Sequence, residues 1–130
     1  MIIIQTTIGS EEDARELTNY LVNKQLIACG TFTKIQSIYK WEEEIQQESE
    51  YEINLYSKES LHDQLIETLQ EKHPYKLPKI TTIKPTYTLP EYDDWVNKET
   101  IYLLSRRYPK ILYSSRFILL SLFLSKAATI

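Results

Sequence analysis

The side chains of this sequence best suited to bind a transition metal are two histidines and one cysteine: His62, His73 and Cys29. Copper(II) binds imidazole nitrogen and thiolate sulfur well and stands at the top of the affinity series for divalent first-row ions. There is no CxxC, HxxxH or HExxH spacing, so a tight structural zinc site is not expected. The metal hypothesis is therefore weak binding of copper(II), or another divalent cation, through His73 with Cys29 as a second ligand. His62 lies among polar residues and is interpreted as solvated.

Both candidate ligands also have a structural interpretation, which we weigh above the ligand role. His73 ends a helical pattern, where a protonated ring would interact favourably with the helix dipole. Cys29 resembles the small buried hydrophobe that most free cysteines are. As the only cysteine it cannot form a disulfide within the chain. Together with an N-terminus that lacks the features of a secretory signal, this favours a reducing compartment and predicts a cytoplasmic location.

Catalysis is disfavoured by residue content. A nucleophile needs a base and an orienting third group, and no recognisable nucleophile motif accompanies the two histidines. The run Glu42, Glu43 and Glu44 is interpreted as a solvated charge cluster in a turn. A phosphate-cradling loop needs glycines, and the chain has only Gly9 and Gly30. We therefore expect a protein that is not an enzyme and requires no cofactor.

The elements that must position these residues follow from hydrophobic periodicity. The pattern predicts strands and helices in the order βαββαβ, followed by a short closing helix. The first helix begins at a serine N-cap with three acids in its first turn. The predicted ranges are a strand over 2–8, a helix over 10–26, a strand over 28–41, a polar turn over 42–47, a strand over 51–56, a helix from 60 to before 74, a strand over 78–88 and a helix over 91–102.

This order is that of an α+β, ferredoxin-like fold, with two helices covering one face of a four-stranded antiparallel sheet. The two middle strands form a long hairpin. Because the strands also carry apolar residues on their other face, we expect that face to be covered by oligomerisation.

Four local strings resemble one family, the CutA divalent-cation tolerance proteins, in the family's order and spacing. They are Leu26-Ile-Ala-Cys-Gly30 for "LAACxN", Ser37-Ile-Tyr-Lys-Trp-Glu42 for "SxYxWxG", His73-Pro-Tyr-Lys-Leu-Pro78 for "HPYxxPE" and Tyr92-Asp-Asp-Trp95 for "YxxW". The resemblance covers residues 1 to about 102. It implies a homotrimer of ferredoxin-like subunits and a role in tolerance of divalent cations, copper especially.

The resemblance also implies a shape similar to the PII signalling proteins, which bind small molecules in clefts between subunits. Tyr39, Trp41, Tyr75 and Trp95 are the candidate residues of such a cleft or of the subunit interface. One hypothesis is that they hold a small molecule. The other, which we favour, is that they bury surface between subunits, where Tyr and Trp are enriched.

This sequence departs from the family pattern at four positions. Glu43 replaces the glycine that follows Trp-Glu in the hairpin, and Tyr56 replaces the lysine at the end of the third strand. Lys79 replaces the glutamate after the second proline, and Lys76 replaces an acidic or polar residue. The two lysines change the charge of any site carried over from the family.

Charge divides the chain into two predicted regions, a CutA-like domain over 1–102 and an atypical tail over 103–130. All eighteen acids lie within 1–102, with nine lysines and one arginine, whereas the tail has five basic residues and no acid. An acidic body does not recruit phosphate backbones, so no nucleic-acid partner is expected.

The tail's apolar core, residues 117–124, is too short to span a bilayer. Two interpretations of the tail stay open: contact with an anionic membrane surface, or unselected sequence. We favour the second.

Overall fold

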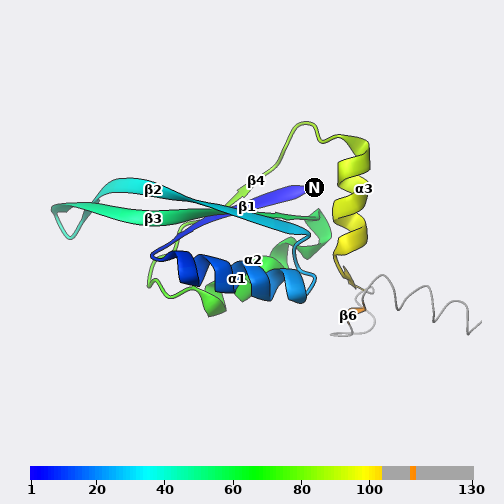
Figure 1. Ribbon diagram of the computed structural model, residues 1–130, viewed down its shortest axis with the longest axis horizontal. Helices are drawn as coiled ribbons and strands as arrows, with labels where there is room; N and C mark the ends of the chain where they lie inside the picture. The colour runs from blue at the N-terminus through cyan, green and yellow to red at the C-terminus, as the bar shows by residue number, and fades with distance from the viewer. Residues whose placement is uncertain (104–111, 114–130) are drawn as a thin grey trace, which may run out of the picture.

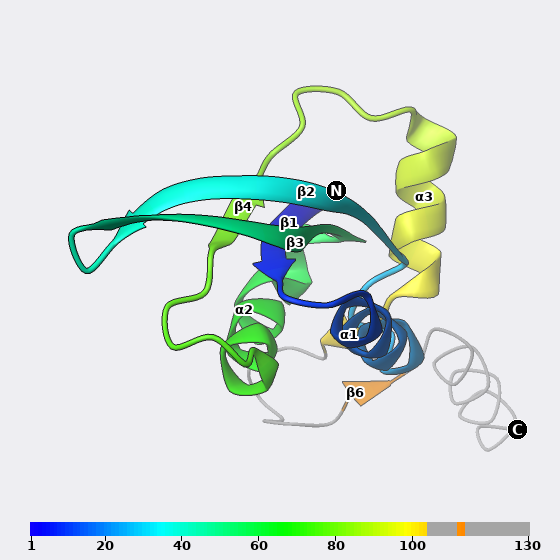
Figure 2. The same ribbon diagram turned by 60° about the vertical axis from the view of Figure 1, so that its left-hand side comes forward.

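The computed structural model describes residues 1–103 and 112–113 of the 130-residue chain. In chain order the elements are β1 (Ile2–Ile8), α1 (Glu11–Asn23), β2 (Cys29–Trp41), β3 (Glu44–Ser57), a 3-10 turn (Glu59–Leu61), α2 (His62–Lys72), β4 (Ile80–Ile83), α3 (Pro90–Glu99), β5 (Tyr102–Leu103) and β6 (Leu112–Tyr113). The first four strands form one antiparallel sheet in the order β2-β3-β1-β4, with α1 and α2 on one of its faces (Figures 1 and 2). This is the predicted α+β, ferredoxin-like arrangement.

The core lies between the sheet and the two helices. The buried residues Ile2, Ile4, Thr6 and Ile8 of β1 follow the alternation that a pleated strand imposes, and Thr7 is buried as well. Their partners across β3 include Leu55 and Ile53, which are also buried. The helices contribute leucines at helical spacing, so that one stripe of each helix meets the inner face of the sheet. The pattern of the sequence thus fixes which face of each element is covered.

Gly30 marks the closest approach of α1 to the sheet. A Cβ added at Gly30 would lie 2.4 Å from Cγ2 of Thr18, a residue of α1. The Thr18 hydroxyl donates to the backbone carbonyl of Ala14 at 2.7 Å, which holds that side chain in place. Glycine is therefore required here by packing, because its missing side chain is what lets the helix lie against β2.

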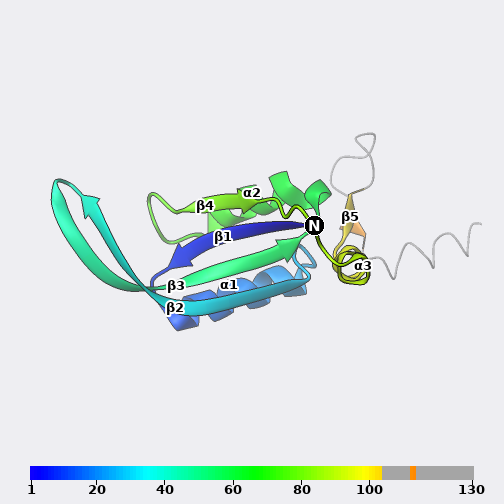
Figure 3. The same cartoon turned by 90° about the horizontal axis from the view of Figure 1, so that it is seen from above.

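The β2–β3 hairpin is the longest feature of the fold and extends well beyond β1 and β4 (Figure 3). Its register pairs Cys29 with Tyr56 at one end and Trp41 with Glu44 at the other. Only Glu42 and Glu43 connect the strands, and both have positive φ, 50° and 68°. Positive φ at both central residues is the signature of a type I′ turn, which matches the twist of a hairpin but favours Asn-Gly.

The third helix is attached to the other end of the sheet by a buried lysine. Lys58, 6% exposed, donates to the backbone carbonyls of Thr100 and Asn97 at 3.4 and 3.5 Å. Its ammonium also lies 3.8 Å from the centroid of the Tyr102 ring. Burial lowers the pKa of this ammonium. A cation at the last carbonyls of α3 is favourable for the helix dipole, so Lys58 stabilises the end of that helix.

The element order is as predicted, whereas several boundaries differ. The first helix ends at Asn23 and not at 26, because the chain reverses at Gln25 with a φ of 58°. The polar turn predicted over 42–47 was wrong beyond Glu43, since residues from Glu44 onward pair with β2. The predicted strand over 78–88 is only Ile80–Ile83, and α3 begins at Pro90 and ends at Glu99.

The tail over 103–130 lies outside the described residues, apart from Leu103 and the short strand Leu112–Tyr113. Within the part that is described, none of the helices has the length and apolar character that crossing a bilayer requires.

Candidate functional site

His73 is held in a buried hydrogen-bond network where α2 ends against β1. It is the C-cap residue of α2, and only 8% of it is exposed. Its Nε2 lies 2.9 Å from the carbonyl oxygen of Thr7 and 3.1 Å from the hydroxyl of Thr6. Its Nδ1 accepts a hydrogen bond from the backbone N–H of Tyr75 at 3.1 Å.

These partners determine the protonation of the ring. A carbonyl oxygen only accepts, so Nε2 of His73 must carry a proton; a backbone N–H only donates, so Nδ1 must have a free lone pair. Burial lowers the pKa of the imidazole, and this outweighs the carbonyl of Thr7 and the charge of Glu50, which both raise it. The predicted position at the helix end is confirmed, but the ring is neutral and does not act as a cation on the dipole.

The same geometry leaves His73 poorly prepared to bind a metal. Both ring nitrogens are already engaged within the chain. Cys29 lies level with Ile3 of β1 in the sheet register, because both pair with Tyr56 of β3. His73 contacts Thr7, which is four residues further along β1. Four steps of about 3.4 Å therefore separate the two candidate ligands by roughly 14 Å along the strands. One chain does not bring His73 and Cys29 together.

No preformed metal cluster exists in the part of the chain that the structure describes, where no three His, Cys, Asp or Glu side chains gather closely enough to hold an ion. His62 is engaged as well, with Nδ1 3.0 Å from an oxygen of Asp63 and Nε2 2.7 Å from the hydroxyl of Thr82. His62 is thus tied to β4 and is less free than its polar sequence context indicates. The described residues do not fit a tight metal site within one chain.

Tyr75 continues the network toward the hairpin. Its ring meets that of His73 edge-on at 4.9 Å, and its hydroxyl donates to Oε2 of Glu50 at 3.0 Å. Glu50 is only 7% exposed, and a carboxylate this buried almost always has a partner, which here is the hydroxyl of Tyr75. Burial, followed by the bond to Glu50, raises the pKa of Tyr75. Gly9 provides the room, because a Cβ there would lie 3.3 Å from the hydroxyl oxygen of Tyr75.

A second tyrosine–carboxylate pair lies next to the first. The hydroxyl of Tyr39 donates to Oε2 of Glu48 at 2.8 Å, and this bond raises the pKa of Tyr39. Glu48 and Tyr39 also act on Tyr75 electrostatically, so the two pairs are neighbours. Both tyrosines were predicted from the sequence, whereas Glu48 and Glu50 were missed. Their separation by two residues on one strand was the available signal.

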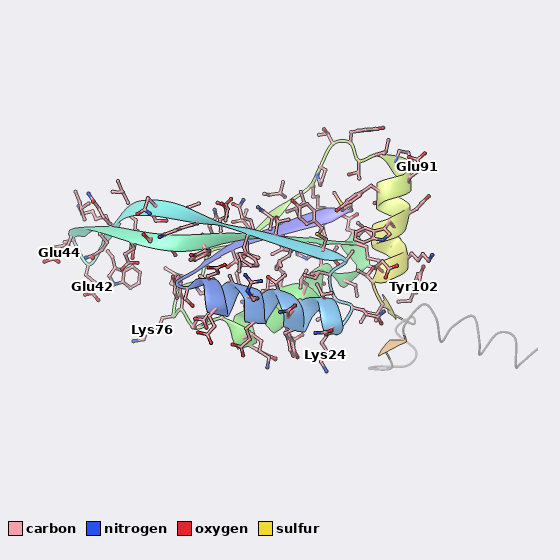
Figure 4. All side chains as sticks on the ribbon, in the orientation of Figure 1. Lys24, Glu42, Glu44, Lys76, Glu91 and Tyr102 are labelled. Carbon is pink, nitrogen blue, oxygen red and sulfur yellow. The ribbon has the colours of Figure 1, made fainter. Side chains whose placement is uncertain are left out.

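The two tryptophans lie at opposite ends of the subunit. Trp41 closes the hairpin beside Glu44, and Trp95 belongs to α3, where its ring lies 5.6 Å from that of Tyr92. Figure 4 shows this separation, with Glu42 and Glu44 at one end and Glu91 at the other. Trp41 and Trp95 are 46% and 42% exposed. The structure therefore groups Tyr39 and Tyr75 and leaves Trp95 outside their site.

Comparison with known proteins gives a consistent family match. The family model described as "CutA1 divalent ion tolerance protein" matches residues 2–99. The divalent-cation tolerance protein CutA of Thermotoga maritima is 36% identical over 101 residues, which are 78% of this chain and 100% of that protein.

Solved structures agree with this match. The crystal structure of CutA1 from Pyrococcus horikoshii is similar with a TM-score of 0.75 and 32% identity, covering 77% of this chain and 98% of that one. A PII-like protein CutA from Nostoc gives a TM-score of 0.73 with 29% identity, over 77% and 97% of the two chains.

Proposed function

The chain belongs to the CutA1 divalent ion tolerance family, and we propose that it is a homotrimeric, PII-like binding protein that acts in tolerance of divalent metal ions, copper in particular. It acts in the cytoplasm, as the lone cysteine favours. It binds its ligand without transforming it.

The exposed apolar residues of the hairpin support a trimer. Ile38 and Ile45 are 69% and 73% exposed, and Trp41 is 46% exposed. The hairpin extends past the body of the sheet, and within the described part of the chain these side chains are left uncovered. Contact with neighbouring subunits removes them from water, which contributes roughly 25 cal/mol for each Å² of apolar surface buried.

Native mass spectrometry tests this assembly directly. We expect a particle of three 15.4-kDa chains, and we expect Ile38→Asp to dissociate it. Val22→Asp is the matched control, because Val22 is 41% exposed but belongs to α1 and not to the hairpin strands. A monomer in the unmodified protein would overturn the proposal.

Copper(II) binding through His73 is the metal part of the proposal. Because both ring nitrogens of His73 are engaged, binding costs the chain one of these hydrogen bonds, so the affinity is weak. A calorimetric copper titration with His73→Ala, and His62→Ala as control, tests it. Saturable binding near one ion per subunit that only His73→Ala abolishes supports this part. If copper does not bind, or binds His73→Ala as well as the unmodified protein, His73 is not a copper ligand.

A second candidate function, a PII-like signalling or adaptor trimer, is favoured by the paired tyrosines. Tyr39 and Tyr75 present aromatic surface beside two carboxylates, a combination suited to a small molecule or a partner protein in a cleft between subunits. A ligand that binds only the folded trimer raises its melting temperature by mass action. A shift with small molecules but not with copper favours this candidate.

A further inference from the structure

An open pocket of about 640 Å³ lies between α2 and β4, at the edge of the sheet. This volume falls within the roughly 300–1,000 Å³ of small-molecule sites. The lining residues come from α2, from the segment that follows it and from β4: His62, Ile66, Gln70, Tyr75, Lys76, Leu77, Pro78, Ile80 and Thr82.

Part of the wall of this pocket, which we call the α2–β4 pocket, is apolar. Ile66, Leu77, Pro78 and Ile80 contribute aliphatic surface, and Tyr75 adds a ring. Leu77 is 73% exposed, so its side chain is available to a ligand and is not part of the core. An apolar wall of this kind favours a ligand with a hydrocarbon body.

The charge of the pocket is opposite to that of the domain around it. Residues 1–102 carry eighteen acids against ten bases, yet none of the described residues that line the α2–β4 pocket is Asp or Glu. A smaller pocket of about 260 Å³, beside α1, is lined by both Asp13 and Glu16. The absence of carboxylates therefore distinguishes the α2–β4 pocket and makes it the one that tolerates an anion.

Lys76 supplies the positive charge. It lies in the segment after α2 and extends from the body of the subunit into solvent (Figure 4). No hydrogen bond or ion pair engages its ammonium within the described residues, whereas nearby Lys79 donates to Oε1 of Gln5 at 2.7 Å. Lys76 is also a position where the sequence departs from the family pattern.

A hydrogen bond connects the two walls of the pocket. Nε2 of His62, on α2, lies 2.7 Å from the hydroxyl of Thr82, on β4. This hydrogen bond fixes the spacing of the helix and the strand without a ligand. The neighbouring carboxylate of Asp63 is fully exposed, so water and salt screen its repulsion of an anion.

We propose that the α2–β4 pocket binds a small amphipathic anion. Its hydrocarbon body lies against Ile66, Leu77 and Ile80, and its anionic head pairs with the ammonium of Lys76. The inference names a ligand class for the Tyr75 end of the candidate site, and so it rests on the proposed ligand-binding role of the trimer.

The test compares three probes of one chain length against the full protein. Octanoate, octanamide and octylamine, below the concentrations at which they form micelles, are followed by backbone amide chemical shifts. We expect octanoate to bind best and octylamine worst, with shifts centred on Gln70, Leu77 and Thr82. Lys76→Gln should weaken octanoate binding about two- to fivefold, the effect of one solvent-exposed ion pair.

Two further variants separate the charge from the apolar wall. Leu77→Asn should weaken octanoate and octanamide equally, whereas Lys24→Gln, which removes a lysine from the far end of α1, should change neither. Equal binding of all three probes, or octanoate binding unchanged by Lys76→Gln, would overturn the inference. If the protein is an intact trimer that fails to bind octanoate, the inference about the pocket is overturned and the proposed assembly stands. If the protein is monomeric, the proposed assembly is refuted.

Discussion

Glycine at position 43 should stabilise the hairpin. Glu43 has a φ of 68°, in the left-handed region that costs a residue with a Cβ about 1–2 kcal/mol. Glycine avoids this cost, but its greater conformational freedom in the unfolded chain reduces the gain in stability by about 0.5–1 kcal/mol. Glu43→Gly should therefore raise the free energy of unfolding of the hairpin by about 0.5–1 kcal/mol.

The control for this prediction is Glu43→Ala, which removes the same charge but keeps the unfavourable φ. Amide hydrogen exchange at Tyr39 to Gln46 reports opening of the hairpin end, and urea unfolding reports the whole domain. We expect slower exchange in Glu43→Gly than in Glu43→Ala. If the two variants exchange at the same rate, relief of charge repulsion explains the effect and the argument from φ is wrong.

Three other perturbations test the packing and the buried network. Gly30→Ala should destabilise the domain by about 1–3 kcal/mol in urea unfolding, because its Cβ meets Thr18 at 2.4 Å, and Thr18→Ser in the same chain should restore part of the loss. His73→Gln should flatten the pH dependence of stability: the unfolded state protonates at its ordinary pKa near 6.5 while the folded ring resists, so the wild-type protein loses stability as the pH falls below about 6.5. Parallel stability curves for the two proteins between pH 7.5 and 5.5 would contradict this. Tyr75→Phe should cost about 1–3 kcal/mol in urea unfolding, because it leaves the buried carboxylate of Glu50 without its donor, and an unchanged midpoint would refute that role.

The fold was predictable because its elements carry strong local signals. The β-branched run from Ile2 to Ile8, the Ser10 cap and the leucine stripes each specify one element and its buried face. The hairpin turn was misplaced because three of the four residues from Glu44 to Gln47 are polar, and this local preference for a turn outweighs the single apolar Ile45. Pairing with β2 overrides that preference, as non-local hydrogen bonds do in long hairpins.

The candidate site was predictable only in part. Tyr39 and Tyr75 were identified from the family resemblance and His73 from its ligand chemistry, but a pattern along the chain does not contain the partners that determine their chemistry. Glu50 precedes a regular strand alternation and looks solvated, yet Tyr75, twenty-five residues later, covers it. Likewise, the neutrality of His73 depends on the carbonyl of Thr7, a contact across sixty-six residues.

The position of β2 affects how the protein must be handled. In the described part of the chain, this strand of thirteen residues pairs on one side only, with β3, and its other edge offers a row of unpaired backbone groups. Such an edge is a template for strand addition and aggregation, which Lys34 and Lys40 oppose with charge. For the trimer proposed above, we therefore expect that dilution or acid that separates the subunits leaves this edge open to pairing with other chains. Refolding should succeed best at low chain concentration, before edges meet in the wrong register.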